Sequence, residues 1–168
     1  MPLDKSRLLD FLKVLDNEMS RKITVVAVGG TAMTLLDLKP STRDIDFTAP
    51  EKDYDEFQRV LQSVPHGFEV QGWSDGTVFS QTLPDDYLEK SKPIANFKHI
   101  HLRALHPVDI VATKIGRLDQ RDLQDIEICV KKFKLSKTQI EERAKQVQYV
   151  GREENYENNL RYVLNELF

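Results

Sequence analysis

The sequence predicts an α+β fold, in which helices pack on a mixed β-sheet and the chain closes in a helical extension. The apolar, β-branched run over 23–28 is typical of a buried strand. Polar and apolar residues alternate over 44–47 and 97–105, as they do in half-buried strands. Between these segments, and through the C-terminal third, apolar residues recur at the spacing of one helix face. Together these patterns favour the α+β class.

Length, charge and cysteine content narrow the class of protein further. A chain of 168 residues is one domain by length. Its 24 basic and 27 acidic residues give a net charge of −3, which argues against an overall basic nucleic-acid binder but leaves local patches open. Cys129 stands alone and has no internal disulfide partner, so we expect a core residue in a reducing compartment. With no apolar run of ~20 residues and no signal-like start, we expect a cytoplasmic protein that has no membrane partner.

The first half of the chain alternates helices and strands. Leu8, Phe11, Leu12 and Leu15 follow the i, i+3, i+4, i+7 pattern of an amphipathic helix. The elements expected here are, in order, a helix over 6–19, a strand over 23–28, a helix over 31–38, a strand over 44–47, a helix between Pro50 and Pro65, and a short strand over 68–70.

The second half begins with an irregular stretch over 72–96, for which we expect only short strands near 77–82. Within it Trp73 could stack on a nucleobase, although packing as a lid on the core is the favoured interpretation. A strand over 97–105 follows, then a helix led by Pro107, a helix over 119–133, a helix capped by Ser136 and Gln139, and a last helix that carries Tyr156 and Leu167. We expect a domain over 1–133 that includes the N-terminal helix, and a helical extension over 134–168 packed on it.

Asp44 and Asp46 are the first candidate site. On a strand, side chains two residues apart leave the same face about 6.6 Å from one another. Two carboxylates that lean to about 5 Å repel by about 3 kcal/mol at an effective dielectric constant of ~20, so a cleft that holds them together favours a hard divalent cation, Mg²⁺ first. The alternative is a solvated strand end, where water and separation remove the repulsion.

A glycine pair, Gly29–Gly30, ends the strand over 23–28 directly before the helical segment over 31–38. Glycine lets the backbone approach a ligand closely, and the amide groups that open a helix suit an anion. Glycine pairs often mark ordinary turns. The conjunction is more specific: a strand that ends in Gly-Gly is followed, after residues 31–43, by Asp-Ile-Asp.

That conjunction resembles the signature of the DNA polymerase β-like nucleotidyltransferase superfamily. The resemblance implies a mixed sheet with packed helices and a reaction that passes a nucleoside monophosphate from a nucleoside triphosphate to an acceptor, with release of pyrophosphate. It further implies that Gly29, Gly30 and Thr31 hold phosphate, and that Asp44 and Asp46 are catalytic ligands of Mg²⁺ or Mn²⁺.

A second motif, HPVDIVATKIGRLDQRDLQDIE, resembles a small prokaryotic branch of the superfamily that includes the abortive-infection toxin nucleotidyltransferases. This resemblance implies that Lys114 contacts the nucleotide phosphates as a catalytic residue. Arg121, Asp122 and Asp125 would lie beside the bound nucleotide. The alternative for the last three is structural: Arg121 and Asp125, four residues apart on a helix, would form a surface ion pair.

The chain departs from the superfamily pattern at one point. In fuller members a third metal-binding carboxylate stands on a later central strand, whereas the segment over 97–105 has histidine and arginine. Glu69, Asp75 or an acid of the following helices could substitute, or the site binds one metal. Two alternatives to an active transferase therefore stay open: an inactive nucleotide-binding or regulatory module, and a protein-binding partner such as half of a toxin–antitoxin pair. The acceptor (RNA, protein or a small molecule) and a protein partner or homo-oligomer are also left open.

Overall fold

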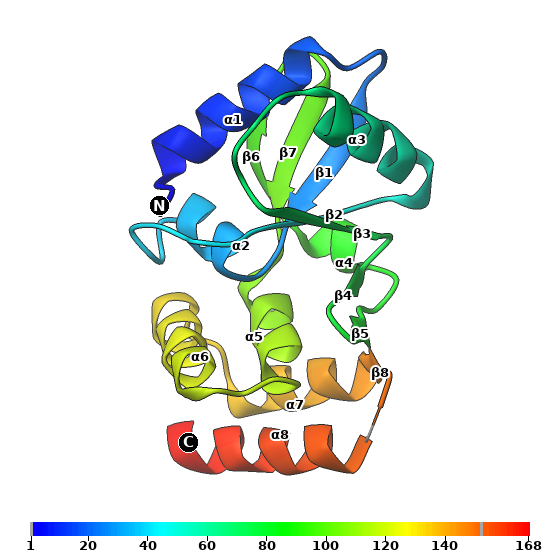
Figure 1. Cartoon of the computed structure of the whole chain (residues 1–168). Helices are drawn as coiled ribbons and strands as arrows, with labels where there is room; N and C mark the ends of the chain where they lie inside the picture. The colour runs from blue at the N-terminus through cyan, green and yellow to red at the C-terminus, as the bar shows by residue number, and fades with distance from the viewer. Residues whose placement is uncertain (1, 152) are drawn as a thin grey trace.

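A five-stranded mixed sheet forms the upper part of the computed structural model, which describes residues 2–151 and 153–168 (Figure 1). Its strands lie in the order β3-β2-β1-β7-β6. The pairs β1–β7 and β2–β3 are parallel, whereas β1–β2 and β6–β7 are antiparallel. This sheet, together with its packed helices and helical C-terminal part, confirms the predicted α+β class.

The bounds of the elements agree with most of the predicted segments. The strands are β1 (Ile23–Ala27), β2 (Ile45–Ala49), β3 (Val70–Ser74), β4 (Thr77–Val78), β5 (Gln81–Thr82), β6 (Lys92–Asn96), β7 (Ile100–Ala104) and β8 (Gln148–Tyr149). The helices are α1 (Lys5–Asn17), α2 (Gly29–Leu35), α3 (Glu51–Ser63), α4 (Tyr87–Lys90), α5 (Pro107–Ile115), α6 (Gln120–Phe133), α7 (Lys137–Gln146) and α8 (Glu153–Leu167). None of these helices combines the length and the hydropathy that a bilayer crossing requires.

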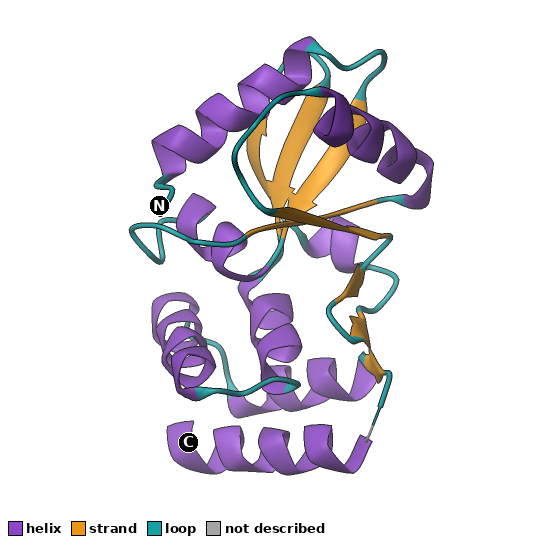
Figure 2. Ribbon diagram, viewed as in Figure 1, coloured by secondary structure: helices purple, strands orange, loops and turns teal. Residues whose placement is uncertain are grey.

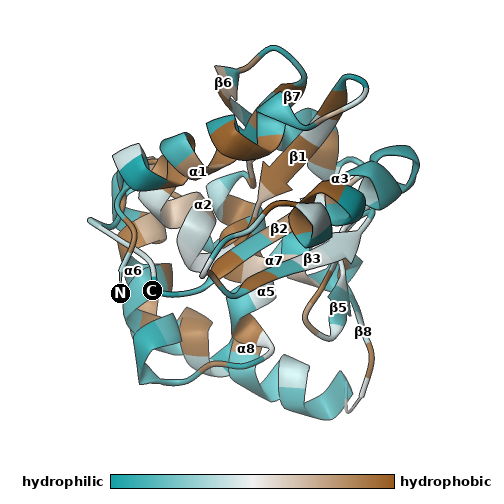
Figure 3. Ribbon diagram, turned by 45° about the horizontal axis from the view of Figure 1, so that its top comes forward, coloured by the Kyte–Doolittle hydropathy of each residue, from teal (hydrophilic) through white to brown (hydrophobic). Residues whose placement is uncertain are grey.

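The core lies around β1, which has a neighbouring strand on each side. Val25 and Val26 are fully buried, and β1 is hydrophobic along its length (Figure 3). Helix α3 packs across β1, β2 and β3, where the ring of Phe57 meets that of Phe47 edge to face at 5.6 Å. The apolar periodicity of the sequence predicts helices such as α1 and α3 because each of them buries one face.

Below the sheet, helix α5 is the centre of a second group of helices, α5 to α8 (Figure 2). Arg143 of α7 donates hydrogen bonds from Nε and Nη2 to the fully buried Asp109 of α5, at 2.5 and 3.0 Å. From α8, Tyr156 and Asn159 donate hydrogen bonds to carbonyl groups of α5 at 2.7 and 2.8 Å. The C-terminal helices therefore hold α5 in place, while the domain boundary at 133/134 stays a prediction.

The stretch over 72–96 is more regular than the sequence predicts. The short strands expected near 77–82 are β4 and β5, and they form a three-stranded sheet with β8, a strand the sequence does not indicate. β6 also lies in this stretch and pairs with β7. Because β6 is an edge strand that contains Pro93 and a register shift, its sequence lacks a clear alternation.

Four predicted segments begin at other residues in the structure. Helix α2 begins at Gly29 and not at residue 31, β3 begins at Val70 and not at 68, and β7 begins at Ile100 and not at 97. Strand β2 begins at Ile45, so Asp44 precedes the strand. The reason at Asp44 is local: its carbonyl oxygen accepts hydrogen bonds from the hydroxyl groups of Thr31 and Thr42, at 3.0 and 2.8 Å.

Candidate functional site

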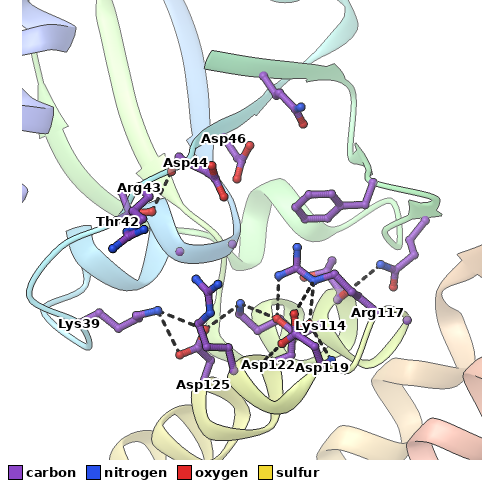
Figure 4. Close-up of a pocket in the computed structure, with 18 of the residues that line it drawn as sticks. Lys39, Thr42, Arg43, Asp44, Asp46, Lys114, Arg117, Asp119, Asp122 and Asp125 are labelled. Atoms are coloured by element: carbon purple, nitrogen blue, oxygen red, sulfur yellow. Dashed lines mark hydrogen bonds and ion pairs between the residues drawn. The ribbon is translucent and has the colours of Figure 1, made fainter. Parts of the chain in front are cut away.

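A cavity of about 860 Å³ lies between the sheet and the α5–α6 pair (Figure 4). Asp44 and Asp46 lie on its upper wall, and Lys114, Arg117, Asp122 and Asp125 lie on the wall opposite. The cavity brings together all but one of the site residues predicted from the sequence: Gly29, Gly30, Asp44, Asp46, Lys114, Arg121, Asp122 and Asp125.

Asp44 and Asp46 differ in their surroundings. Asp44 is exposed, whereas Asp46 is only 6% exposed, and no described residue donates a hydrogen bond to its carboxylate. Burial, and after it the charge of Asp44, raises the pKa of Asp46 to about 6, against the opposing effects of Arg117 and Lys114. A buried carboxylate that lacks a hydrogen-bond donor and faces a like charge is suited to a cation, and oxygen ligands of this kind fit Mg²⁺ or Mn²⁺.

The two glycines are required for different reasons, a left-handed backbone conformation at Gly29 and a close approach of Thr42 at Gly30. Gly29 has a φ of +55°, in the left-handed region, and a Cβ on it would be 3.7 Å from Asp46 Oδ2. A Cβ on Gly30 would be 2.9 Å from Thr42 Oγ1, closer than side chains tolerate. The glycines thus let the start of α2 lie directly against residues 42–46, which explains why the two motifs occur together.

Thr31 has a different position from the one that the resemblance implies. It is fully buried, and the cavity lining does not include it. Its hydroxyl group donates to the Asp44 carbonyl and accepts from the Asp46 backbone N–H, both at 3.0 Å. In this structure Thr31 therefore fixes the backbone of Asp44 and Asp46. Its hydroxyl group is used in these hydrogen bonds and does not face the cavity.

Lys114 is the central cation of the opposite wall. It is only 6% exposed, and its Nζ lies 3.0 Å from Asp125 Oδ2 and 3.4 Å from Asp122 Oδ1. Lys39 approaches the other oxygen of Asp125 at 3.3 Å. The carboxylates of Asp122 and Asp125 thus hold cations at the cavity wall.

Arg117 is a site residue that the sequence analysis missed. Its Nε and Nη2 donate to the two oxygens of Asp122, both at 2.8 Å. These hydrogen bonds raise the pKa of Arg117, and although burial alone would raise that of Asp122, Arg117 and Lys114 together lower it. The signal in the sequence is the spacing: Arg117 lies three residues after Lys114 and five before Asp122, on the turn that joins two helices.

Arg121 lines the cavity and is exposed. The alternative pairing of Arg121 with Asp125 is not formed, since Asp125 instead contacts Lys114 and Lys39. Within the described ranges no acidic side chain forms an ion pair with Arg121 or with Arg43, another exposed cation of the lining. Both guanidinium groups are therefore available to an anionic ligand.

Comparison with known proteins agrees with this geometry. A family model described as "Nucleotidyltransferase of unknown function (DUF6036)" matches residues 6–167. The chain belongs to this family. Membership supports the predicted nucleotidyltransferase resemblance at the level of the family, and it does not bear on the narrower resemblance to the toxin branch. A search of curated proteins and a search of solved structures found no match.

The strand order in this nucleotidyltransferase family member determines which residues lie beside Asp46. Strand β2 lies between β1 and β3, whereas β7 is the partner of β1. Gln71 of β3 stands in register with Asp46, and Glu69, just before β3, lines the cavity. Asp75 does not line it and instead accepts a hydrogen bond from Tyr87 at 3.3 Å.

No group of three His, Cys, Asp or Glu side chains among the described residues comes together as a metal site. Metal binding by Asp44 and Asp46 stays a prediction. Two carboxylates suffice for Mg²⁺, which commonly binds through one or two protein carboxylates and completes its shell with water and substrate phosphates.

Proposed function

We propose that this protein is a metal-dependent nucleotidyltransferase that moves a nucleoside monophosphate from a nucleoside triphosphate to an acceptor. The observation that carries the proposal is the arrangement of charge across one cavity. Asp44 and Asp46 stand on one wall, and the cations Lys114, Arg117 and Arg121 line the other. A triphosphate with a divalent ion has the complementary pattern of charge.

Asp44 and Asp46 are the residues that would hold Mg²⁺ or Mn²⁺. When bound, such an ion offsets charge on the phosphates and lowers the pKa of the attacking group. Gly29 keeps the space beside Asp46 free of a side chain, so a phosphate can approach the carboxylates closely, and both glycines line the cavity.

The cations of α5 and α6 would bind and orient the triphosphate. Lys114 is held by two carboxylates, so it costs little conformational entropy to keep its ammonium group at the wall. In the reaction the acceptor hydroxyl group releases its proton to water and its oxygen forms a bond to the α-phosphorus, while the bond from that phosphorus to the oxygen bridging to the β-phosphate breaks. Lys114, Arg117 and Arg121 would stabilise the negative charge that passes to the departing pyrophosphate.

The acceptor is RNA, a protein hydroxyl or a small molecule. We also propose that the protein acts as the toxin of a toxin–antitoxin pair, which rests on the resemblance of the segment from His106 to Glu127 to the toxin nucleotidyltransferases. In that case a protein partner would bind it.

An inactive nucleotide-binding module is the second candidate. The observation in its favour is that Asp44 and Asp46 have no third carboxylate beside them among the described residues. Both candidates bind a triphosphate, and only the first transfers label from it.

The test uses a triphosphate labelled at the α-phosphate, magnesium and a cell extract as the source of acceptors. We expect label to pass to an acceptor, and we expect both Asp44→Asn and Asp46→Asn to lose at least a hundredfold of that rate, because each removes a metal ligand. Magnesium-dependent binding without transfer would support the inactive module. Transfer by both variants at the wild-type rate would overturn the assignment of the carboxylates.

A further inference from the structure

The cavity has a second end whose chemistry the phosphates and the metal do not use. Phe79, Gln81 and Tyr149 line this end, and they come from the small sheet β4-β5-β8 and its hairpin turn. It adjoins the cationic wall, by which we mean the side of the cavity formed by Lys114, Arg117 and Arg121. Gly116, which also lines the cavity, lies between Lys114 and Arg117 in the chain. An aromatic and amide surface next to a phosphate-binding wall has the composition of a nucleobase site.

Gln81 has a fixed and unsatisfied acceptor. The side chain is 2% exposed, and its Nε2 donates a hydrogen bond to the Thr113 carbonyl at 2.6 Å. Its buried Oε1 accepts no hydrogen bond from any residue that the structure describes. Reversal of the amide would set two oxygens against one another, so the free group is the acceptor. Buried acceptors are rarely left unpaired, and one in a ligand cavity is suited to a donor on the ligand.

Gly116 lets Gln81 and Tyr149 pack closely against the end of α5. A Cβ on Gly116 would be 3.1 Å from Gln81 Nε2 and 3.1 Å from Tyr149 Cε2. Any side chain here would therefore displace both groups. The glycine allows the amide and the tyrosine ring to lie directly against the last turn of α5.

Phe79 occupies a backbone position that disfavours it. It is the first residue of the two-residue turn between β4 and β5 and has a φ of +56°, where such turns usually have Gly, Asn or Asp. Its ring is 40% exposed, and it is held between the ring of Trp73, at 4.8 Å, and the Arg117 guanidinium, at 5.6 Å. Strain of this kind is found mainly where a side chain serves a site. Trp73 itself is not part of the lining, so it acts as support for Phe79.

We propose that this end of the cavity binds the nucleobase of the triphosphate, and that Gln81 Oε1 accepts a hydrogen bond from an exocyclic amino group. The inference rests on the proposed function and specifies its substrate class: adenine, guanine or cytosine nucleotides in preference to uracil. Phe79 and Tyr149 provide apolar ring surface on which the base packs.

The first experiment compares triphosphates that differ only in the amino group. Binding to the wild-type chain is measured in magnesium without acceptor for ATP against purine riboside triphosphate, and for GTP against inosine triphosphate, with UTP and inorganic tripolyphosphate alongside. We expect at least one amino-bearing nucleotide to bind about tenfold more tightly than its partner, the effect of one hydrogen bond to a buried acceptor.

Equal affinities within both pairs would overturn the inference. Binding of tripolyphosphate together with equal affinities would leave the proposed function standing and reject only the base site. If tripolyphosphate and all nucleotides fail to bind, the proposed function itself fails.

The second experiment compares Gln81→Met with Gln124→Met, the same change at an exposed position of α6 that does not line the cavity. Gln81→Met is expected to equalise the affinities within the pair that the wild type separates, whereas Gln124→Met is expected to keep the preference. A preference that survives Gln81→Met would overturn the role of Oε1. If Gln81→Met does not fold, the wild-type comparison decides alone.

Discussion

Replacing Asp46 by asparagine is expected to stabilise the metal-free protein. The pKa of Asp46 rises from 3.8 to about 6 on folding, because the carboxylate is buried and lies near Asp44. A tenfold change in proton affinity corresponds to about 1.36 kcal/mol, so the charged form of Asp46 lowers the free energy of unfolding by about 3 kcal/mol at neutral pH. Asp46→Asn has no charge there and avoids this cost.

The difference in stability between Asp46→Asn and wild type depends on pH, and the direction of the pKa change determines in which pH range it appears. A carboxyl group that binds its proton more tightly in the folded state favours folding below pH 3.8, and this contribution is lost as the pH rises through about 6. We therefore expect Asp46→Asn to match the wild type near pH 3 and to exceed it by about 3 kcal/mol at pH 7.

The assay is urea unfolding at a series of pH values in the presence of a chelator, supported by thermal melts. For a chain of this length about 3 kcal/mol corresponds to a rise of about 6–12 °C in Tm. Asp119→Asn is the matched control, since Asp119 is exposed and caps α6, where asparagine serves equally well. That variant is expected to stay within about 0.5 kcal/mol of wild type.

Magnesium is expected to cancel most of this difference. At a hundredfold excess over its Kd, a ligand that binds only the folded state adds about 2.7 kcal/mol, and Asp46→Asn should not receive this stabilisation. The reasoning is refuted if Asp46→Asn is as stable as wild type, or less stable, at pH 7 without metal. It is also refuted if any gain is the same at pH 3 and pH 7.

Three other substitutions test the supports of the site. Gly30→Ala is expected to cost about 1–3 kcal/mol in urea unfolding, since its Cβ would meet Thr42 Oγ1 at 2.9 Å, and Thr42→Ala in the same chain should restore part of that loss; a strictly additive double variant would contradict the clash. Arg143→Met leaves Asp109 charged and buried, and we expect a loss of about 3–5 kcal/mol in the same assay; a loss under 1 kcal/mol would contradict this. Asp122→Asn removes the charge that holds two cations, so we expect triphosphate affinity, measured by calorimetry, to fall about tenfold or more, and unchanged affinity would show that Asp122 does not position them.

The fold class and most helices could be predicted because their signals are local. The buried face of each helix repeats along the sequence, and β1 is a continuous β-branched run. Even the glycine pair and the Asp-Ile-Asp segment could be joined from the sequence, although the physical reason for their association, the contact of Gly30 with Thr42, is visible only in the structure.

Other features depend on which elements become neighbours, and no local pattern contains that information. The order of the strands sets β3 and not β7 beside Asp46, and this pairing could not be predicted from the sequence of either strand. Strand β8 has two residues and exists only because β5 lies next to it. Gln81 has an ordinary sequence context, and its unpaired oxygen becomes visible only once Thr113 is known to accept from the same amide.

The contacts that hold α5 also bear on when the protein can function. Asn159 and Tyr156 bind the carbonyl groups of the turn that precedes and includes Ile115, directly beside Lys114. During synthesis the chain emerges from its N-terminus, so the sheet and both carboxylates are made long before these two residues. The cationic wall then lacks its last supports until α8 has left the ribosome. A nascent chain would therefore have the wall with Asp44 and Asp46 before the opposite wall is firmly supported, and the cavity takes its final form only after Tyr156 and Asn159 have been added.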